Sequence, residues 1–449
     1  MTGTTRGRPA RFPGGAGTCR TQWDRSAGAD RRGPTFRAMT KITRCRLGGL
    51  ATTSVLILTL TACGGGDDGK DDFTKPKQNA DVTFSGDPIK VMTFTPYDTD
   101  TINFKAALDV AEGARVAINN DGGINGHELQ VVPCNEGADP NKAAACARKA
   151  VDEGVSAVVG GFSANGDTIL PILEKAGIPW IAPPVISAAE LTSKFSYPIV
   201  PGVIAQAGLA ARAAQDDCDT IASVQYDLPS ADSVKKLADL GLASEGHGPA
   251  KILRVPPTTT DFSSVAQEVS EYDCAVMSLP SGPLVGVATA GASLGSKTKF
   301  YAFPGTLTDS AISQAAGTLD TAVTLSPFPP ASDGVWDDAK KAVGPMTDEE
   351  NGGWSYMSYQ STWVGYQLLE SVLKDSDDVT AAGVKAAFDA ASDVDAKGFV
   401  PALDFTQEFP APNLNRVFDR QVVFLGIEDG ELTQDGDYVD LSGSLTPAS

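Results

Sequence analysis

The stretch NNDGGING at residues 119–126 lies between an amphipathic segment, 102–119, and a β-branched run, 129–133. Its glycines are typical of a helix end followed by a tight turn, because glycine adopts a left-handed backbone conformation at little steric cost. The stretch therefore predicts a helix that stops and a strand that begins within a few residues. By itself it has a structural role and binds nothing.

Alternating strands and helices continue on both sides of this turn. In series they imply parallel sheets covered by helices on both faces. The roughly 350 residues from 89 to 435 are too many for one core, so we expect two such domains. The expected strands are 89–95, 129–133, 157–160, 180–182, 198–201, 221–226, 251–255, 275–279 and 299–303, and the expected helices are 102–119, 140–152, 168–176, 204–214, 231–244, 263–271 and 284–294.

Four segments resemble, in order, the leucine/isoleucine/valine-binding family of solute-binding proteins. They are NNDGGING at 119–126, ADPNKA at 138–143, VSAVVGGFS at 155–163 and IPWIAP at 178–183, and looser similarity extends from about 89 to 429. The resemblance implies the type I periplasmic-binding fold, an α/β fold of two doubly wound parallel-sheet lobes with a ligand cleft between them. It also implies three crossovers between the lobes, which we expect near residues 200–204, 322–328 and 381–391. Lobe 1 would then comprise 89–202 with about 325–385, and lobe 2 would comprise 203–324 with about 390–440.

The residues before the first strand predict an export signal that ends directly before Cys63. The apolar segment 47–62 follows Lys41, Arg44 and Arg46 and has only about 16 residues, whereas a membrane-spanning helix needs roughly 20. The run LTAC that closes it resembles the lipobox of bacterial lipoproteins. The resemblance implies that the Cys63 thiol carries a lipid and that the protein is anchored on the extracytoplasmic face of the cell membrane.

The segments before and after this signal differ from it in composition. Residues 1–38 are Arg-rich and full of Gly and Pro, and Met39 starts a sound signal sequence. We therefore interpret 39–62 as the signal peptide, and 1–38 as a mis-assigned start or a disordered extension. Residues 63–88 are rich in Gly, Asp and Lys and predict a flexible tether.

Charge excludes several classes of partner. The chain has 36 Lys and Arg and 56 Asp and Glu residues; 11 of the basic and 2 of the acidic ones precede Cys63, which leaves a net charge of about −29 from that residue on. Such a surface favours solubility and repels nucleic acid and anionic lipid headgroups. We expect a monomer that binds no nucleic acid.

Four cysteines remain beyond Cys63, and an even number in an exported protein predicts two disulfides. Three pairings are possible. Cys134 and Cys146 are 12 residues apart, at a strand end and in the following helix, so they can meet. Cys218 and Cys274 each stand just before an apolar strand, and cysteines at the same end of neighbouring parallel strands can also close.

Ligands of open α/β sheets bind beyond the carboxyl ends of the strands. This rule selects the loops 95–100, 162–167, 183–188, 226–232, 280–283 and 303–308. The resemblance implies that two hydroxyls, Ser163 and Ser187, bind the carboxylate of an amino-acid ligand. Loop position alone adds five candidate ligand-binding residues, which are Tyr97, Tyr226, Asp227, Ser281 and Thr306.

The second half of the family's site is not retained. Family members hold the ligand's ammonium group with an acidic residue and cover its other face with an aromatic one, where this chain has Pro304-Gly305 and Ser230-Ala231. Asp227 or Asp309 would have to replace the acid. Because a buried ammonium without a counter-charge costs several kcal/mol, an amide, a carboxylic acid, a peptide or another small polar solute stays open beside an amino acid.

Enzymatic chemistry is not predicted. The run GFSAN at 161–165 begins like a nucleophile elbow but has Asn165 where the second glycine should stand. There is no phosphate-binding or dinucleotide-binding loop, no CxxC pair, and only His127 and His247 as histidines, so we expect neither cofactor nor metal. The sequence predicts a solute-binding protein that delivers a small molecule to ABC permease subunits. The alternative is a ligand-sensing or adhesive surface lipoprotein without a transport role.

The lipid anchor leads to a direct test. Cys63→Ser should abolish lipidation and leave unprocessed precursor or shed soluble protein, because only a cysteine thiol accepts the lipid. Detergent-phase partitioning of membranes that express each form measures this. Partitioning of the variant with the membrane fraction, as for the unchanged protein, would contradict the lipoprotein hypothesis.

Overall fold

The computed structural model of the protein divides the chain into two units, Met1–Gly69 and Lys70–Ser449. All described residues belong to the second unit, and they are 77–99, 102–228, 231–344, 346, 353–411 and 413–446. The predicted signal peptide, the predicted lipidation site Cys63 and the tether as far as residue 76 lie outside the described residues. Within these ranges, no helix is both long and apolar enough to cross a membrane.

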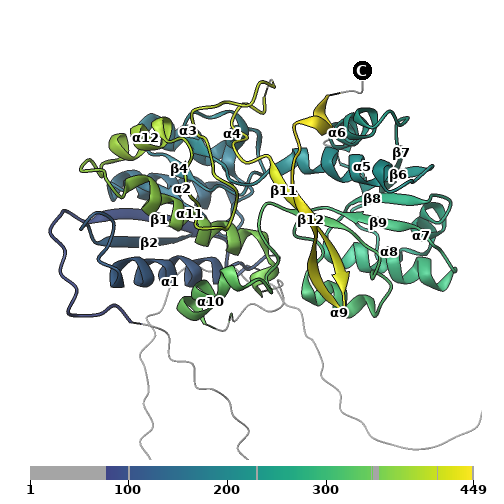
Figure 1. Cartoon of the computed structure of the whole chain (residues 1–449), viewed down its shortest axis with the longest axis horizontal. Coiled ribbons are helices and arrows are strands. Elements are labelled where there is room, and N and C mark those ends of the chain that lie inside the picture. Colours follow the sequence, from purple (N-terminus) through teal and green to yellow (C-terminus); the bar gives the residue numbers. More distant parts are fainter. Residues whose placement is uncertain are drawn as a thin grey trace, which may run out of the picture. The chain divides into compact units, whose positions relative to one another are not determined.

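Lobe 1 is built on a five-stranded parallel sheet with the order β2-β1-β3-β4-β5. Its strands β1, β2 and β4 are labelled in Figure 1. Val91 of β1 packs in a cluster with helices α1 and α11, whereas Met92 and Phe94 pack with α2 and α3 on the other face. Helices therefore cover both faces. The strands are β1 (Ile89–Thr95), β2 (Leu129–Asn135), β3 (Ala157–Val159), β4 (Trp180–Ile181) and β5 (Ser196–Tyr197), and the helices are α1 (Ala106–Asn120), α2 (Pro140–Asp152), α3 (Gly166–Ala176), α4 (Ala188–Thr192), α10 (Asp337–Val343), α11 (Met357–Leu373) and α12 (Ala381–Ala390).

The stretch NNDGGING stops α1 and starts β2, as predicted. Gly122 and Gly123 have φ values of 100° and 77°, and the Gly123 N–H donates to Ile118 O at 2.9 Å. The buried Asn119 side chain donates to Leu129 O at 2.9 Å and accepts from Leu129 N at 2.8 Å. One amide group thus connects the last turn of the helix to the first residue of the strand.

Lobe 2 is built on a four-stranded parallel sheet with the order β7-β6-β8-β9. Its helices α5 and α6 approach closely, because a Cβ atom on Gly241 of α6 would lie 2.0 Å from Ala207 O of α5. The strands are β6 (Ile221–Tyr226), β7 (Lys251–Val255), β8 (Cys274–Ser278) and β9 (Lys299–Ala302), and the helices are α5 (Ala205–Gln215), α6 (Ala231–Ser244), α7 (Ser263–Val269), α8 (Ser281–Ser293) and α9 (Asp309–Ala315).

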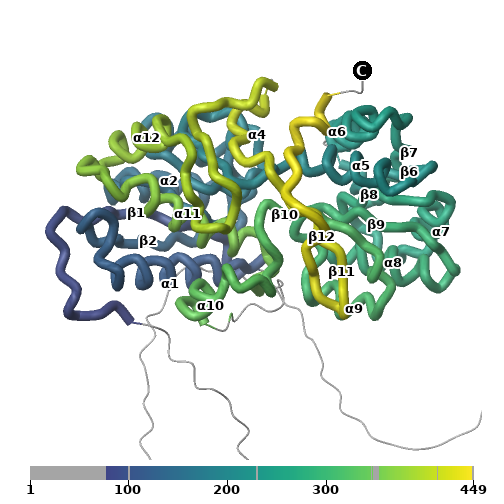
Figure 2. Tube along the Cα trace, in the orientation of Figure 1, coloured from purple at the N-terminus to yellow at the C-terminus, as the bar shows by residue number. Residues whose placement is uncertain are grey.

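A third, antiparallel sheet has the order β10-β11-β12 and was not predicted. Strand β10 (Thr324–Ser326) pairs with β11 (Gln421–Glu428), which forms a hairpin with β12 (Glu431–Asp440). Figure 2 shows these strands side by side although nearly a hundred residues separate β10 from β11. Short 3₁₀ helices are η1 (Gly202–Ile204), η2 (Gly334–Trp336), η4 (Gly353–Ser355) and η5 (Gly443–Leu445).

Two sequence expectations differ from the structure. The strand expected at 198–201 is β5 instead, which ends before Pro198 because proline has no N–H for the ladder. The third crossover does not lie at 381–391. Phe388 of α12 contacts Tyr197 of lobe 1 at a ring-centroid distance of 5.1 Å. The later Phe405 and Phe418 contact the same ring at 5.8 and 6.2 Å, so the chain leaves lobe 1 only shortly before β11.

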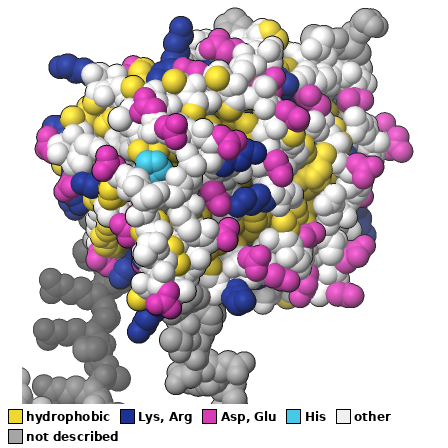
Figure 3. Space-filling model, turned by 60° about the vertical axis from the view of Figure 1, so that its left-hand side comes forward, with side chains coloured by type: hydrophobic (Ala, Val, Ile, Leu, Met, Phe, Trp, Pro, Cys, Tyr) yellow, Lys and Arg dark blue, Asp and Glu magenta, His cyan; other side chains and the backbone are white. Residues whose placement is uncertain are grey.

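The surface carries many more acidic than basic side chains. On the face shown in Figure 3, Asp and Glu are scattered rather than gathered in one patch, with Lys and Arg between them. Several pairs are salt bridges on single helices, such as Lys235–Asp239 and Lys385–Asp389. On this face the negative charge is therefore spread out and forms no single acidic patch.

Both expected disulfides are present. Cys134 of β2 is joined to Cys146 of α2, and Cys218 is joined to Cys274, the first residue of β8. Of the three possible pairings, the structure has the one that the spacing favours. The two bonds close loops of different length, with sequence separations of 12 and 56 residues.

Removing each disulfide should destabilise the protein by a different amount. By loop-closure entropy, the pair Cys134→Ser and Cys146→Ser should lower the free energy of unfolding by about 3 kcal/mol, and the pair Cys218→Ser and Cys274→Ser by about 4 kcal/mol. Urea unfolding of the two double variants under identical conditions measures both. A larger loss from the shorter loop would contradict the entropic explanation.

Candidate ligand-binding site

A cavity of about 890 Å³ opens between the two lobes. It lies at the carboxyl ends of the parallel strands, since Phe162 follows β3, Tyr226 ends β6, and Ser278 ends β8. The first crossover, with Val200 and Gly202, also lines it. Its position is the one that open α/β sheets reserve for ligands.

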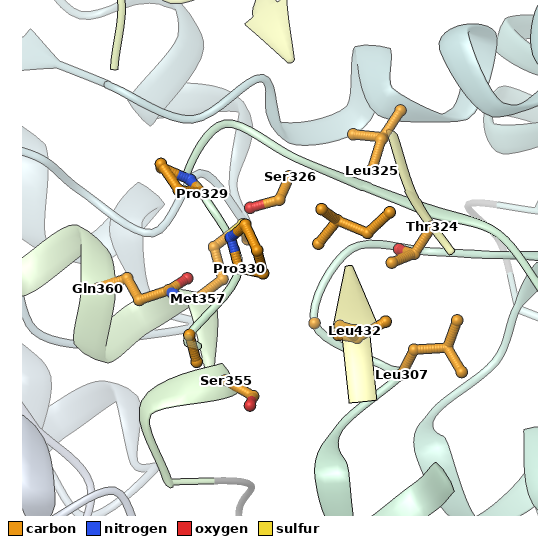
Figure 4. A pocket seen from close by; sticks show the side chains of 13 residues that line it. Leu307, Thr324, Leu325, Ser326, Pro329, Pro330, Ser355, Met357, Gln360 and Leu432 are labelled. Carbon is orange, nitrogen blue, oxygen red and sulfur yellow. The ribbon is translucent and has the colours of Figure 1, made fainter. Parts of the chain in front are cut away.

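A much smaller cavity of about 30 Å³ adjoins it and shares Gly305 and Met357 with it. Figure 4 shows Met357 and Gln360 of α11 on one side of this space and Leu307 and Leu432 on the other. A volume of this size holds little more than water. The large cavity is therefore the candidate ligand-binding site.

Helix α11 holds the lobe 1 side of the cavity in place. A Cβ atom on Gly160 would lie 2.7 Å from Thr362 Cα, so only glycine permits this approach. The Gly161 N–H donates to Thr362 Oγ1 at 2.9 Å, and Ser358 Oγ donates to Gly161 O at 2.9 Å. These contacts position the loop after β3, which carries Phe162 into the cavity.

Three aromatic rings form an apolar surface on this side. The Phe104 ring lies 4.5 Å from the Phe162 ring and stacks on the Tyr356 ring at 4.9 Å between centroids. Val185 and Ile186 from the loop before α4 extend the surface. Val185 has a φ of 57°, which is strained for a β-branched residue and costs about 1–3 kcal/mol.

The lobe 2 side presents hydroxyl and amide groups between apolar residues. Ser278 Oγ donates to Gln206 Oε1 at 2.8 Å. Thr306 Oγ1 donates to Phe303 O at 2.6 Å, and Thr308 accepts from Ala311 N at 3.2 Å at the start of α9. Among the described residues that line the cavity, none is Asp, Glu, Lys, Arg or His.

Three of the seven predicted ligand-binding residues line the cavity, namely Tyr226, Ser281 and Thr306. Tyr97 does not, and its backbone instead bonds with the Asn135 side chain at 3.1 and 2.8 Å. Asp227 is 60 % exposed and pairs with Arg254 at 3.1 Å. Asp309, the other carboxylate considered for an ammonium group, is exposed at the start of α9 and is not part of the lining.

The two serines that the resemblance placed on the ligand also lie outside the lining. Ser163 is buried; its hydroxyl donates to Glu136 Oε2 at 3.1 Å and accepts from Asn165 N at 3.0 Å. Ser187 precedes α4, and its Oγ is buried beside Gly166. Their neighbours in sequence, Phe162 and Ile186, face the cavity instead.

Two buried glutamates accept hydrogen bonds from these loops, and neither was predicted from the sequence. Burial raises the pKa of Glu136, opposed by hydrogen bonds from Asn165 and Ser163. Burial also raises the pKa of Glu190 to about 7, opposed by the N–H groups of Ser187 and Ile186. The spacing of Ser187 and Glu190 is a capping-box signature, so the second could have been found from sequence.

Sequence reasoning also missed Gln206 and Ser361. Both are buried, both line the cavity, and Gln206 Nε2 and Ser361 Oγ have no hydrogen-bond partner among the described residues. Gln206 lies in the alanine-rich helix α5. Ser361 lies in α11, which comes late in the sequence and packs back onto lobe 1. Neither residue carries a local signal in the sequence.

Comparisons with known proteins agree with this architecture. Residues 89–418 match the model of the periplasmic binding protein family. Over 85 residues, 19% of this chain, the sequence is 39% identical to the Leu/Ile/Val-binding protein of Escherichia coli (strain K12). That stretch covers 23% of the relative, so the chain spans less than a quarter of the length of the curated relatives that it matches.

Solved structures share the fold at low identity. An extracellular ligand-binding receptor from Verminephrobacter eiseniae has a TM-score of 0.65 at 17% identity, over 77% of this chain and 99% of that one. A fatty acid ABC transporter substrate-binding protein from Thermomonospora curvata has a TM-score of 0.64 at 15% identity, over 84% and 98%. A solute-binding protein from R. palustris in complex with 4-hydroxybenzoate has a TM-score of 0.63 at 17% identity, over 79% and 97%. Because the family model matches most of the sequence, from residue 89 to residue 418, this chain belongs to the periplasmic binding protein family.

Proposed function

We propose that this protein captures a small molecule between its two lobes outside the cytoplasmic membrane and delivers it to an ABC importer. The cavity of about 890 Å³, lined by residues of both lobes, is the observation that carries the proposal. Its volume falls within the range of about 300–1,000 Å³ that is usual for small-molecule sites. The family is one of solute-binding proteins rather than enzymes.

Capture would proceed by closure of the lobes about their crossovers. A ligand that contacts both Phe162 on lobe 1 and Ser281 on lobe 2 would shift the population towards the form in which the lobes are closed around it. At the first crossover, Gly202 has a φ of 54°, and a Cβ atom there would lie 2.3 Å from Val185 Cγ1. The crossover therefore depends on a glycine packed directly against the lobe 1 loop.

Location and partners rest on several independent observations. Two disulfides suit an oxidising compartment, which agrees with the periplasmic family. Similar solved structures include a putative branched-chain amino acid ABC transporter from Rhodospirillum rubrum, which supports ABC permease subunits as partners. Anchoring through Cys63 and the monomeric state remain part of the proposal.

The names of the relatives mention several classes of solute. These are Leu, Ile and Val, benzoates and fatty acids. The amino acid, amide or carboxylate expected from Ser163 and Ser187 would need other groups to bind it, because neither serine lines the cavity.

A thermal-shift screen of residues 64–449 tests the proposal. Amino acids, amides, carboxylates, aromatic acids, fatty acids, sugars and neutral lipids would be screened separately. A true ligand at about 100 times its dissociation constant should add roughly 2.7 kcal/mol to the free energy of unfolding.

A matched pair of variants locates the binding. Ser281→Trp fills the cavity from the first residue of α8 and should remove the shift, whereas Ser293→Trp at the exposed far end of the same helix should retain it. Absence of a shift with every class, or a shift that persists in Ser281→Trp, would overturn the proposal that this cavity captures a solute.

A further inference from the structure

We infer that the cavity takes an uncharged, largely apolar molecule that offers a hydrogen-bond acceptor, such as an amide or ester carbonyl, to Gln206. The inference rests on the proposed function and narrows its solute class. It follows from three properties of the cavity: apolar surfaces, the lack of a charged side chain in its described lining, and one buried lining residue on each lobe whose polar group has no described partner.

Apolar groups face the cavity from both lobes. Phe104 and Phe162 on lobe 1 lie opposite lobe 2 residues such as Leu279, Val285 and Phe303. Burying hydrocarbon against such surfaces is favourable in proportion to the area removed from water. A solute with an extended apolar part is therefore matched to most of this lining.

Charged solutes find no counter-charge in the described lining. The nearby carboxylates lie outside the lining: Glu136 Oε2 accepts from Ser163 and Asn165, Glu190 Oε2 accepts from two backbone N–H groups, and the Oε1 atom of each is buried without a described partner. Asp227 pairs with Arg254 at the surface. An ammonium or carboxylate group would thus be desolvated between the lobes without an ion of opposite sign, which is costly.

Gln206 and Ser361 determine which polar groups a ligand should carry. Gln206 is 1% exposed and its Oε1 accepts from Ser278, which leaves Nε2 as a donor without a described partner. Ser361, on α11 across the cavity, is 3% exposed and its hydroxyl is likewise unpartnered among the described residues. Because a buried donor left unpaired is unfavourable, a ligand acceptor at Nε2 removes that cost.

Competition against a neutral fluorescent probe tests the inference. Nile red, which is uncharged and carries a carbonyl oxygen, would be bound to residues 64–449 and displaced with octanamide, methyl octanoate, octanoate and octylammonium. The four competitors share one chain length and differ in the head group. We expect the amide and the ester to displace the probe at concentrations at least ten-fold lower than the acid and the amine.

Substitution of Gln206 adds a second readout. Gln206→Leu removes the donor and should weaken octanamide binding about 3- to 10-fold, whereas Gln215→Leu, at the exposed end of the same helix, should not change it. Gln206→Glu places a carboxylate in the cavity and should reverse the preference, so that octylammonium binds better than octanamide. Ser361→Ala should weaken octanamide binding without affecting folding, because its hydroxyl has no described partner to lose.

The outcomes separate this inference from the proposed function. Octanoate, octylammonium or leucine that binds as tightly as octanamide, and that Ser281→Trp excludes, would overturn the neutral class and leave solute capture intact. No effect of Gln206→Glu on the preference between amine and amide would also overturn it. Failure of all these compounds and of every class in the thermal-shift screen would overturn both.

Discussion

Helix α11 approaches the carboxyl end of β3 so closely that Gly160 has no room for a side chain, and Gly161 is confined in the same way by Phe94 O of β1. Hydrogen bonds from Gly161 to Thr362 and from Ser358 to Gly161 fasten the two segments, although nearly two hundred residues separate them. The same contact turns Phe162 towards the cavity and brings Ser358 and Ser361 of α11 to its edge. One glycine pair thus determines both the packing of lobe 1 and the shape of the proposed binding surface. A larger residue at Gly160 would displace α11 and open the site, whereas one at Gly161 would collide with the backbone of β1 at Phe94.

Much of the fold could be predicted because its signals are local. The helix stop at NNDGGING and the alternation of strands and helices each depend on a few neighbouring residues. The cysteine pairs followed from the same alternation. The third sheet could not be predicted, because β10 pairs with strands from the end of the chain and no local pattern records that register. The same reason applies to the cluster around Tyr197, which keeps Phe388, Phe405 and Phe418 with lobe 1.

The candidate site was predictable only at the level of loops. Strand polarity placed Tyr226, Ser281 and Thr306 at the cavity, but it could not tell which residue of a loop faces inward. Ser163 and Ser187 illustrate the difficulty, because each turns away from the cavity towards a buried glutamate or a helix start, and an apolar neighbour takes its place. Gln206 and Ser361 acquire their significance from burial without a partner, which is a property of the assembled structure. No sequence pattern around either residue expresses that property.

The position of α11 late in the sequence also affects how the chain is exported. Cys134 and Cys146 are close in sequence and can be joined as soon as their part of the chain emerges. Lobe 1, by contrast, lacks the helix that covers β3 until residues beyond 370 are available, and the aromatic cluster on Tyr197 needs residues as far as 418. The N-terminal half cannot complete its core on its own. Because its core is completed this late, the polypeptide remains unfolded, and can pass through a narrow secretion channel, until most of its length has been exported.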